Sequence, residues 1–175
     1  MTMKKILFSL IALMAVMTVQ AQSICGTWRT IQAVVATQDD NSFSVDSFTF
    51  TFNEDGTYNM VNETTESTEP APTMAMEIAL SFDLSGTYTL DGDQLTMTPN
   101  IDTYKADVLS ISVNGRVSND TNQINTFKQL INSPSAKAEF DVKETYTIKI
   151  ADQMLEMTQE GWGTMQLMRF STIKN

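Results

Sequence analysis

Ser47-Phe48-Thr49-Phe50-Thr51-Phe52 is the stretch that decides the fold, because its apolar and hydroxyl side chains alternate strictly. Successive side chains of a β-strand point to opposite faces, so the three phenylalanines share one face and the hydroxyls share the other. Asn53-Glu54-Asp55-Gly56 follows, and its Asp-Gly pair favours a tight hairpin turn. Alternation resumes at residues 57–61. Residues 47–61 therefore predict a half-buried β-hairpin.

The same hairpin pattern recurs twice further along the chain. Residues 85–98 alternate around Asp91-Gly92-Asp93, and residues 145–158 alternate around Ala151-Asp152-Gln153. We expect further strands at residues 26–35, 78–82, 104–113 and 164–170, which gives about eight or nine short strands in up-and-down order. Eight strands suffice to close a barrel, and closure removes exposed sheet edges. The sequence thus predicts an all-β protein built as an antiparallel, up-and-down, eight-stranded β-barrel.

One polar stretch does not fit this strand pattern. Residues 63–72 are acidic and end in Pro70-Ala71-Pro72, which is typical of a loop. The continuation, Thr73-Met74-Ala75-Met76, is apolar for a loop. Two interpretations stay open: Met74 and Met76 belong to a lid over a cavity mouth, or the whole stretch is a flexible connector.

A second stretch predicts the one short helix. Residues 119–132 carry Ile124, Phe127 and Ile131 at helical spacing, with Asp120 or Thr121 available as the N-cap and a proline beyond the end. We expect this amphipathic helix to pack against the barrel.

The N-terminal residues show the three-region pattern of a secretory signal peptide. Lys4 and Lys5 precede an apolar run at residues 6–19, and Val19-Gln20-Ala21 offers a cleavage site. A bilayer span needs roughly 20 apolar residues, so a permanent anchor is disfavoured, and Ile24 is too bulky for a lipoprotein acylated at the following cysteine. We expect residues 1–21 to be removed and residues 22–175 to form a single domain. The mature protein would then be periplasmic, or at the cell surface or secreted, with no membrane span.

Composition narrows the possible functions. Loss of the two leader lysines changes the net charge from −10 to −12, which disfavours nucleic acid and anionic membranes as partners. The chain has no histidine and one cysteine, so histidine-based catalytic triads, histidine metal sites and disulfide scaffolds are excluded. Cys25 is either a small buried side chain or a free thiol able to pair between chains.

Motifs at both ends of the predicted barrel, and in two of its hairpins, match a known family. Cys25-Gly26-Thr27-Trp28 opens the first strand with Gly-x-Trp, and Met165-Gln166-Leu167-Met168-Arg169 closes the last with an arginine. Phe50-x-Phe52-x-x-Asp55-Gly56-Thr57-Tyr58 and Gly86-Thr87-Tyr88-Thr89-Leu90-x-Gly92-Asp93-x-Leu95 supply the hairpins. With these motifs nearly the whole mature chain resembles the calycin superfamily, specifically the lipocalin-like domains that Gram-negative bacteria export. It differs from long eukaryotic lipocalins in having no disulfide and no second signature motif.

The resemblance implies a structural plug at one end of the barrel. In that family the tryptophan lies across the closed end and the arginine packs over its ring, roles that would fall here to Trp28 and Arg169. A guanidinium over an indole gains cation–π attraction and can also donate to carbonyl groups at strand ends. Gly26 would let the backbones approach closely at this plug.

A ligand of such a barrel would lie in its interior. Methionine suits an adaptable apolar pocket and tyrosine hydroxyls add polar contacts. The expected inward-facing set is Phe50, Tyr58, Met60, Tyr88, Met97, Tyr146 and Met157. These side chains either line a cavity or fill the barrel, since eight strands leave little space.

The leading expectation is an exported, non-enzymatic protein that binds a small hydrophobic or amphipathic molecule. The alternative is a protein-interaction module, such as a protease inhibitor or an accessory subunit of a surface complex, with a filled barrel and an acidic loop at residues 63–72. An enzyme ranks third, because only carboxylates remain for acid–base chemistry and Asp91 and Asp93 flank a turn. We expect no catalytic residue, no cofactor and no metal site, since the turn lacks the longer ligand spacing of a calcium loop.

Overall fold

The computed structural model describes residues 23–38, 41–71, 74–161 and 163–170, so the expected signal peptide lies outside the described residues. The strands are β1 Gly26–Thr30, β2 Val34–Gln38, β3 Asn41–Phe52, β4 Thr57–Ala71, β5 Met74–Asp91, β6 Gln94–Pro99, β7 Lys105–Val113, β8 Arg116–Val117, β9 Glu144–Ala151, β10 Met154–Gln159 and β11 Gly163–Phe170. The helices are the 3₁₀ turn η1 Ile101–Thr103, α2 Thr121–Ile131 and α3 Pro134–Phe140.

Eight of these strands close a barrel. In order around it they are β1, β3, β4, β5, β6, β9, β10 and β11, and β1 pairs antiparallel with both β3 and β11. Every pairing between neighbours is antiparallel, and chain order equals spatial order. The predicted up-and-down, eight-stranded barrel is therefore confirmed.

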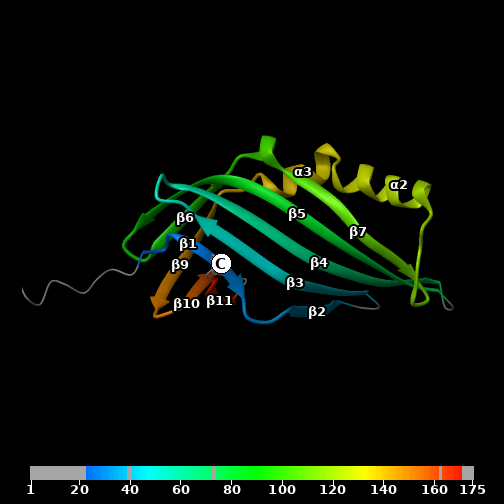
Figure 1. The fold of residues 1–175 in the computed structure, drawn as a ribbon, viewed down its shortest axis with the longest axis horizontal. Helices are drawn as coiled ribbons and strands as arrows, with labels where there is room; N and C mark the ends of the chain where they lie inside the picture. Colours follow the sequence, from blue (N-terminus) through cyan, green and yellow to red (C-terminus); the bar gives the residue numbers. More distant parts are fainter. Residues whose placement is uncertain (1–22, 39–40, 72–73, 162, 171–175) are drawn as a thin grey trace, which may run out of the picture.

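Three barrel strands are much longer than the others and continue beyond the barrel. β4 has 15 residues and β5 has 18. The second half of β5 pairs with β6 inside the barrel, whereas its first half pairs with β7 outside it. We call the continuation of β3, β4 and β5, together with β2, β7 and β8, the extended sheet. Figure 1 shows its strands running away from the short strands β9, β10 and β11.

The helices cover one face of this extended sheet. α2 begins at Asp120, whose carboxylate accepts hydrogen bonds from the backbone N–H groups of Asn122 and Gln123. Phe127 projects from α2 toward the sheet and packs on a cluster that includes Ile78 of β5. Figure 1 shows α2 and α3 lying along β7. The helix expected at residues 119–132 is present, but a second, seven-residue helix follows it. The expected packing against the barrel was wrong, because the exposed apolar face that needed covering belongs to the extended sheet.

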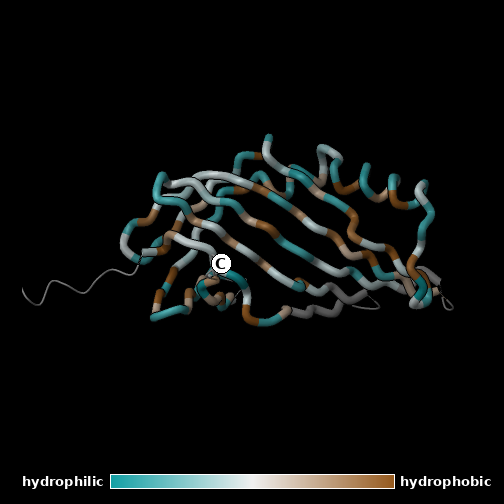
Figure 2. The backbone as a smooth tube through the Cα atoms, viewed as in Figure 1, coloured by the Kyte–Doolittle hydropathy of each residue, from teal (hydrophilic) through white to brown (hydrophobic). Residues whose placement is uncertain are grey.

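The molecule accordingly has two apolar cores. The barrel core contains the buried residues Ile24, Trp28, Phe50, Phe52, Tyr58, Leu95, Met97, Ile148, Leu155, Met157 and Leu167. The core of the extended sheet contains Ile78, Leu80, Val108 and Ile111, against which Ile124, Phe127 and Ile131 pack. Figure 2 shows hydrophobic residues interspersed with hydrophilic ones along the long strands, as expected of sheets with one buried face.

The prediction of a loop at residues 63–72 was wrong. The described part of this stretch lies in β4, and Met74 and Met76, expected in a lid or connector, lie in β5. β4 is paired on both sides here, with β3 and with β5. The backbone hydrogen bonds of two neighbours thus hold a polar segment extended, although its own side chains show no apolar face.

Other strand predictions were correct in kind but not in extent. The single strand expected at residues 26–35 is two, β1 and β2, separated by a bend. Residues 104–113 do form a strand, β7, but it pairs with the extended part of β5 and not within the barrel. Residues 78–82 and 85–90 belong to one strand, β5.

Trp28 and Arg169, the two residues to which the family resemblance points, are in contact. The Arg169 guanidinium carbon lies 4.3 Å from the Trp28 ring centroid. The same guanidinium donates to the carbonyl oxygens of Cys25 and Ser23, at 3.0 and 2.7 Å. Gly26 has a φ of 129°, which residues with a side chain rarely adopt, and a Cβ there would lie 3.1 Å from an Arg169 nitrogen.

Candidate functional site

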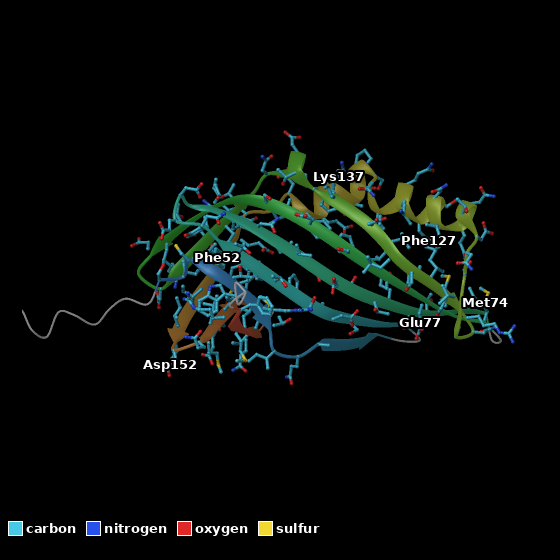
Figure 3. All side chains as sticks on the ribbon, in the orientation of Figure 1. Phe52, Met74, Glu77, Phe127, Lys137 and Asp152 are labelled. Carbon is cyan, nitrogen blue, oxygen red and sulfur yellow. The ribbon has the colours of Figure 1, made fainter. Side chains whose placement is uncertain are left out.

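A partly open cavity of about 380 Å³ lies between the extended sheet and the two helices. We call it the helix-covered cavity. Its sheet wall is formed by β4 and β5, and its helix wall by Phe127, Leu130 and Ile131 of α2 and Phe140 of α3. Figure 3 shows Phe127 on α2 above the long strands, and Phe52 near the barrel end of the molecule. The volume falls in the range of small-molecule sites, about 300–1,000 Å³.

The β5 side of the cavity is apolar. Ile78, Leu80 and Phe82 alternate along β5 in phase with Leu84, which is buried, and with Tyr88, which packs against the barrel core. The cavity therefore lies on the face of the sheet that is continuous with the inside of the barrel.

An aromatic cluster closes the cavity between β5, η1 and α3. The rings of Phe82, Tyr104 and Phe140 lie 5.1–6.3 Å apart. The Tyr104 hydroxyl donates to the carbonyl oxygen of Ile131 at 2.9 Å, which ties the C-terminal end of α2 to this cluster. Tyr104 and Phe82 thus hold the helix pair over the sheet.

The β4 side of the cavity carries a row of polar side chains. Asn62, Thr64 and Glu66 occupy alternate positions, and Asn62 and Thr64 pair in register with Phe82 and Leu80. Asn62 is 8% exposed and Thr64 is 1% exposed. No described residue supplies a hydrogen-bond partner to Asn62 Oδ1 or to Thr64 Oγ1. A buried polar group without a partner costs about 1–3 kcal/mol, so these two atoms are the strongest sign of a binding site in the described chain.

The opposite face of β4 shows the contrast. There Glu63 Oε2 accepts a hydrogen bond from Ser47 at 3.1 Å, and Thr65 Oγ1 donates to Asp46 Oδ2 at 2.6 Å. Side chains on the outward face thus have partners on β3, whereas the buried pair on the inward face has none among the described residues.

The solvent side of the cavity is acidic. Glu66 and Glu139 both line it, and both are exposed. Burial, helped by the charge of Glu139, raises the pKa of Tyr104 to about 12. The nearby lysines are engaged: Lys128 forms an ion pair with Asp107 at 2.7 Å, and the Lys137 ammonium lies 5.8 Å from the Tyr104 ring centroid.

The ligand-binding residues predicted from the sequence lie elsewhere, in the barrel. Phe50, Tyr58, Met97 and Met157 are buried in the barrel core, and Met60, Tyr88 and Tyr146 pack against it. The Tyr88 hydroxyl donates to Asn53 O at 2.8 Å, and that of Tyr146 donates to Glu144 Oε2 at 2.7 Å. These contacts are those of packed, paired side chains, and none of these residues lines the helix-covered cavity.

A second cavity, of about 360 Å³, borders Tyr58 and the polar outer surface of β4, β5 and β6. Its polar side chains are paired with each other: Asn59 donates to Asp83 and Ser85, and Asn53 donates to Thr57. None of its lining residues has a buried side-chain nitrogen or oxygen without a hydrogen-bond partner, in contrast to Asn62 and Thr64.

Sequence reasoning identified Ile124, Phe127 and Ile131 but assigned them to packing, and it missed Asn62 and Thr64. Every residue from Asn62 to Thr68 is polar, so no apolar alternation marked this stretch as a strand. Within the described ranges no helix is long and apolar enough to cross a membrane, and no three acidic or cysteine side chains gather as a metal site would require.

Comparisons with known proteins identify no family for this chain. No family model matches this chain, and no curated protein sequence matches it. One similar solved structure is an uncharacterized protein from Bacteroides eggerthii DSM 20697, at 15% identity and a TM-score of 0.43. The likeness covers 85% of this chain and 100% of that chain, and at this level it carries no functional argument.

Proposed function

We propose that the protein binds a small amphipathic molecule, without converting it, in the helix-covered cavity. The observation that carries this proposal is the pair of buried, unpartnered atoms, Asn62 Oδ1 and Thr64 Oγ1, in an otherwise largely apolar cavity. Such a combination of apolar walls with a few convergent polar groups is typical of small-molecule sites. A bound ligand would supply the missing hydrogen bonds and cover the apolar side chains of β5 and α2.

The sequence supports a place outside the cytoplasm for this activity. Residues 1–21 have the features of a signal peptide, and the motifs around Trp28 and Arg169 resemble exported lipocalin-like domains. The proposed site nevertheless differs from a barrel-interior site, because it lies between the extended sheet and the helices.

The alternative of a protein-interaction module rested on an acidic loop at residues 63–72, on the acidic surface and on a filled barrel. The described residues of that stretch are paired on both sides within the sheet, so the loop is not available to it. The orphaned atoms of the cavity favour the small-molecule proposal over this alternative.

Two matched tryptophan variants test the proposal. Ala136 of α3 lines the cavity, whereas Ala138 is exposed on the same helix and does not line it. Ala136→Trp should fill the cavity and Ala138→Trp should leave it open. Native mass spectrometry of the exported protein, purified gently from its own host, should show an added mass that is lost on denaturation.

We expect that added mass in the wild type and in Ala138→Trp, and its loss in Ala136→Trp. Circular dichroism of both variants checks that the fold is retained. The proposal would be refuted by a wild-type protein that carries no added mass and takes up nothing from a hydrophobic metabolite extract. Full retention of the ligand in Ala136→Trp would refute the location.

A further inference from the structure

The polar groups that face the helix-covered cavity mostly accept hydrogen bonds. Asn62 Oδ1 is an acceptor, and so are the ionised carboxylates of Glu66 and Glu139, whereas the Thr64 hydroxyl can act either way. A ligand that satisfies these groups must therefore donate N–H or O–H. A carboxylate head group carries no donor and would leave the buried amide oxygen unpaired.

The charge around the cavity also disfavours a ligand with a carboxylate head group. No lysine or arginine is among its lining residues. Two lysines lie near its wall: Lys128 forms an ion pair with Asp107, and the Lys137 ammonium lies over the ring of Tyr104, which lines the cavity. An anionic ligand would meet the two carboxylates that line the cavity, whereas no lining residue is basic, and like-charge juxtaposition of this kind disfavours binding.

The positions along β4 separate the two kinds of acceptor. Asn62 and Thr64 are buried, while Glu66 is exposed. Four residues of an extended strand span about 13 Å, so the buried acceptor at Asn62 and the carboxylate at Glu66 lie far enough apart for an apolar segment between them. Ile78 and Leu80 of β5 provide the surface that such a segment would contact.

Resting on the proposed function, we infer that the ligand is an elongated amphipathic amine. Its protonated nitrogen meets Glu66 and Glu139 at the solvent side, its apolar body lies on Ile78 and Leu80, and an O–H or N–H donor reaches Asn62 and Thr64. An aliphatic amine has a pKa near that of lysine, about 10.4, and is protonated at neutral pH.

A set of three probes that differ only in charge tests this inference. Aminodecanol, decanediol and hydroxydecanoic acid share one chain and one terminal hydroxyl, and carry an ammonium, a hydroxyl and a carboxylate at the other end. Isothermal titration of each into the ligand-free protein, at one fixed ionic strength, should place aminodecanol first and hydroxydecanoate last. We expect at least about a tenfold difference in Kd between these two.

Variants that each remove one carboxylate charge test which glutamates contact the ammonium group of aminodecanol. Glu66→Gln and Glu139→Gln should each weaken aminodecanol binding about two- to fivefold, as for a partly exposed ion pair, and leave decanediol unchanged. Glu77→Gln is the matched control. Glu77 lies on β5 with its carboxylate accepting from Ser112, at a position that does not line the cavity, and Figure 3 places it near the far end of the extended sheet. Glu77→Gln should change none of the three affinities, which separates a local contact from the overall negative charge.

The outcomes distinguish the inference that the ligand is an amine from the proposal that the helix-covered cavity binds a ligand. Binding of hydroxydecanoate as tight as that of aminodecanol, or equal effects of all three variants, would overturn the amine and leave the cavity as a binding site. Failure of all three probes to bind, in a wild-type protein that also carries no ligand from its host, would overturn both.

Discussion

Replacement of Thr64 by valine should stabilise the ligand-free protein. The Thr64 side chain is 1% exposed and no described residue bonds its Oγ1. Burying a hydroxyl without a partner costs about 1–3 kcal/mol, and valine has nearly the same shape with a methyl group in its place. We expect Thr64→Val to raise the free energy of unfolding by about 1–2 kcal/mol, or the Tm by roughly 2–8 °C for a chain of this size.

Urea denaturation of the ligand-free chain measures this difference, with Thr65→Val as the control. Thr65 is the next residue of β4, on the opposite face, and its hydroxyl donates to Asp46 at 2.6 Å. Removing that hydrogen bond should cost about 0–1 kcal/mol. The two adjacent substitutions, identical in chemistry, are therefore expected to shift the urea midpoint in opposite directions or to leave only the control unshifted.

The same substitution should weaken ligand binding. A hydrogen bond contributes about 0.5–1.5 kcal/mol net, so loss of the hydroxyl should raise the Kd of decanediol roughly two- to tenfold. A stabilised protein that binds less well is the signature of a side chain retained for its ligand. If Thr64→Val instead lowers the free energy of unfolding by more than about 1 kcal/mol, the hydroxyl is satisfied within the folded chain and the reasoning fails.

Two further predictions concern the stability of the folded chain. A Cβ at Gly86 would lie 2.3 Å from the carbonyl oxygen of Thr98. Gly86→Ala should therefore lower the free energy of unfolding, measured by urea titration, by about 1–3 kcal/mol. An unchanged urea midpoint would contradict the close approach of β5 and β6. Burial raises the pKa of Tyr58 to about 12 and that of Tyr104 to about 12. Because unfolded tyrosine ionises near pH 10, the stability from these residues is intact below about pH 10 and is lost as pH rises toward 12. Tyrosinate absorbance should show no ionisation near pH 10 while the protein stays folded, and a normal titration there would disprove the burial.

The barrel could be predicted from sequence because the strand pattern and the turn residues of each hairpin lie within one short stretch of sequence. Phe48, Phe50 and Phe52 alternate with threonine, and the turn that follows contains Gly56 at a positive φ of 80°. Each hairpin therefore shows its own strand period and its own turn, and sequential hairpins give the up-and-down order without long-range knowledge.

The extended part of β4 could not be predicted in this way. Between Asn62 and Thr68 both faces of the strand are polar, so no window of sequence contains an apolar period. The strand exists because β3 and β5 pair with it on either side, which is a tertiary effect. Asn62 and Thr64 consequently looked like loop residues, and their burial under the helices carries no mark in the sequence around them.

These same polar residues explain why a cavity exists where it does. α2 packs closely on β5 and β7, where Ile78, Leu80, Val108 and Ile111 form an apolar surface. Across β4 the sheet presents Asn62 and Thr64 instead, which give the helix nothing apolar to bury, so close packing stops at that edge. Leucines at these two positions would extend the apolar surface and let the helix pair settle onto it. Under the proposed function, the polar row of β4 would thus be both the recognition surface and the reason that the space beside it stays open.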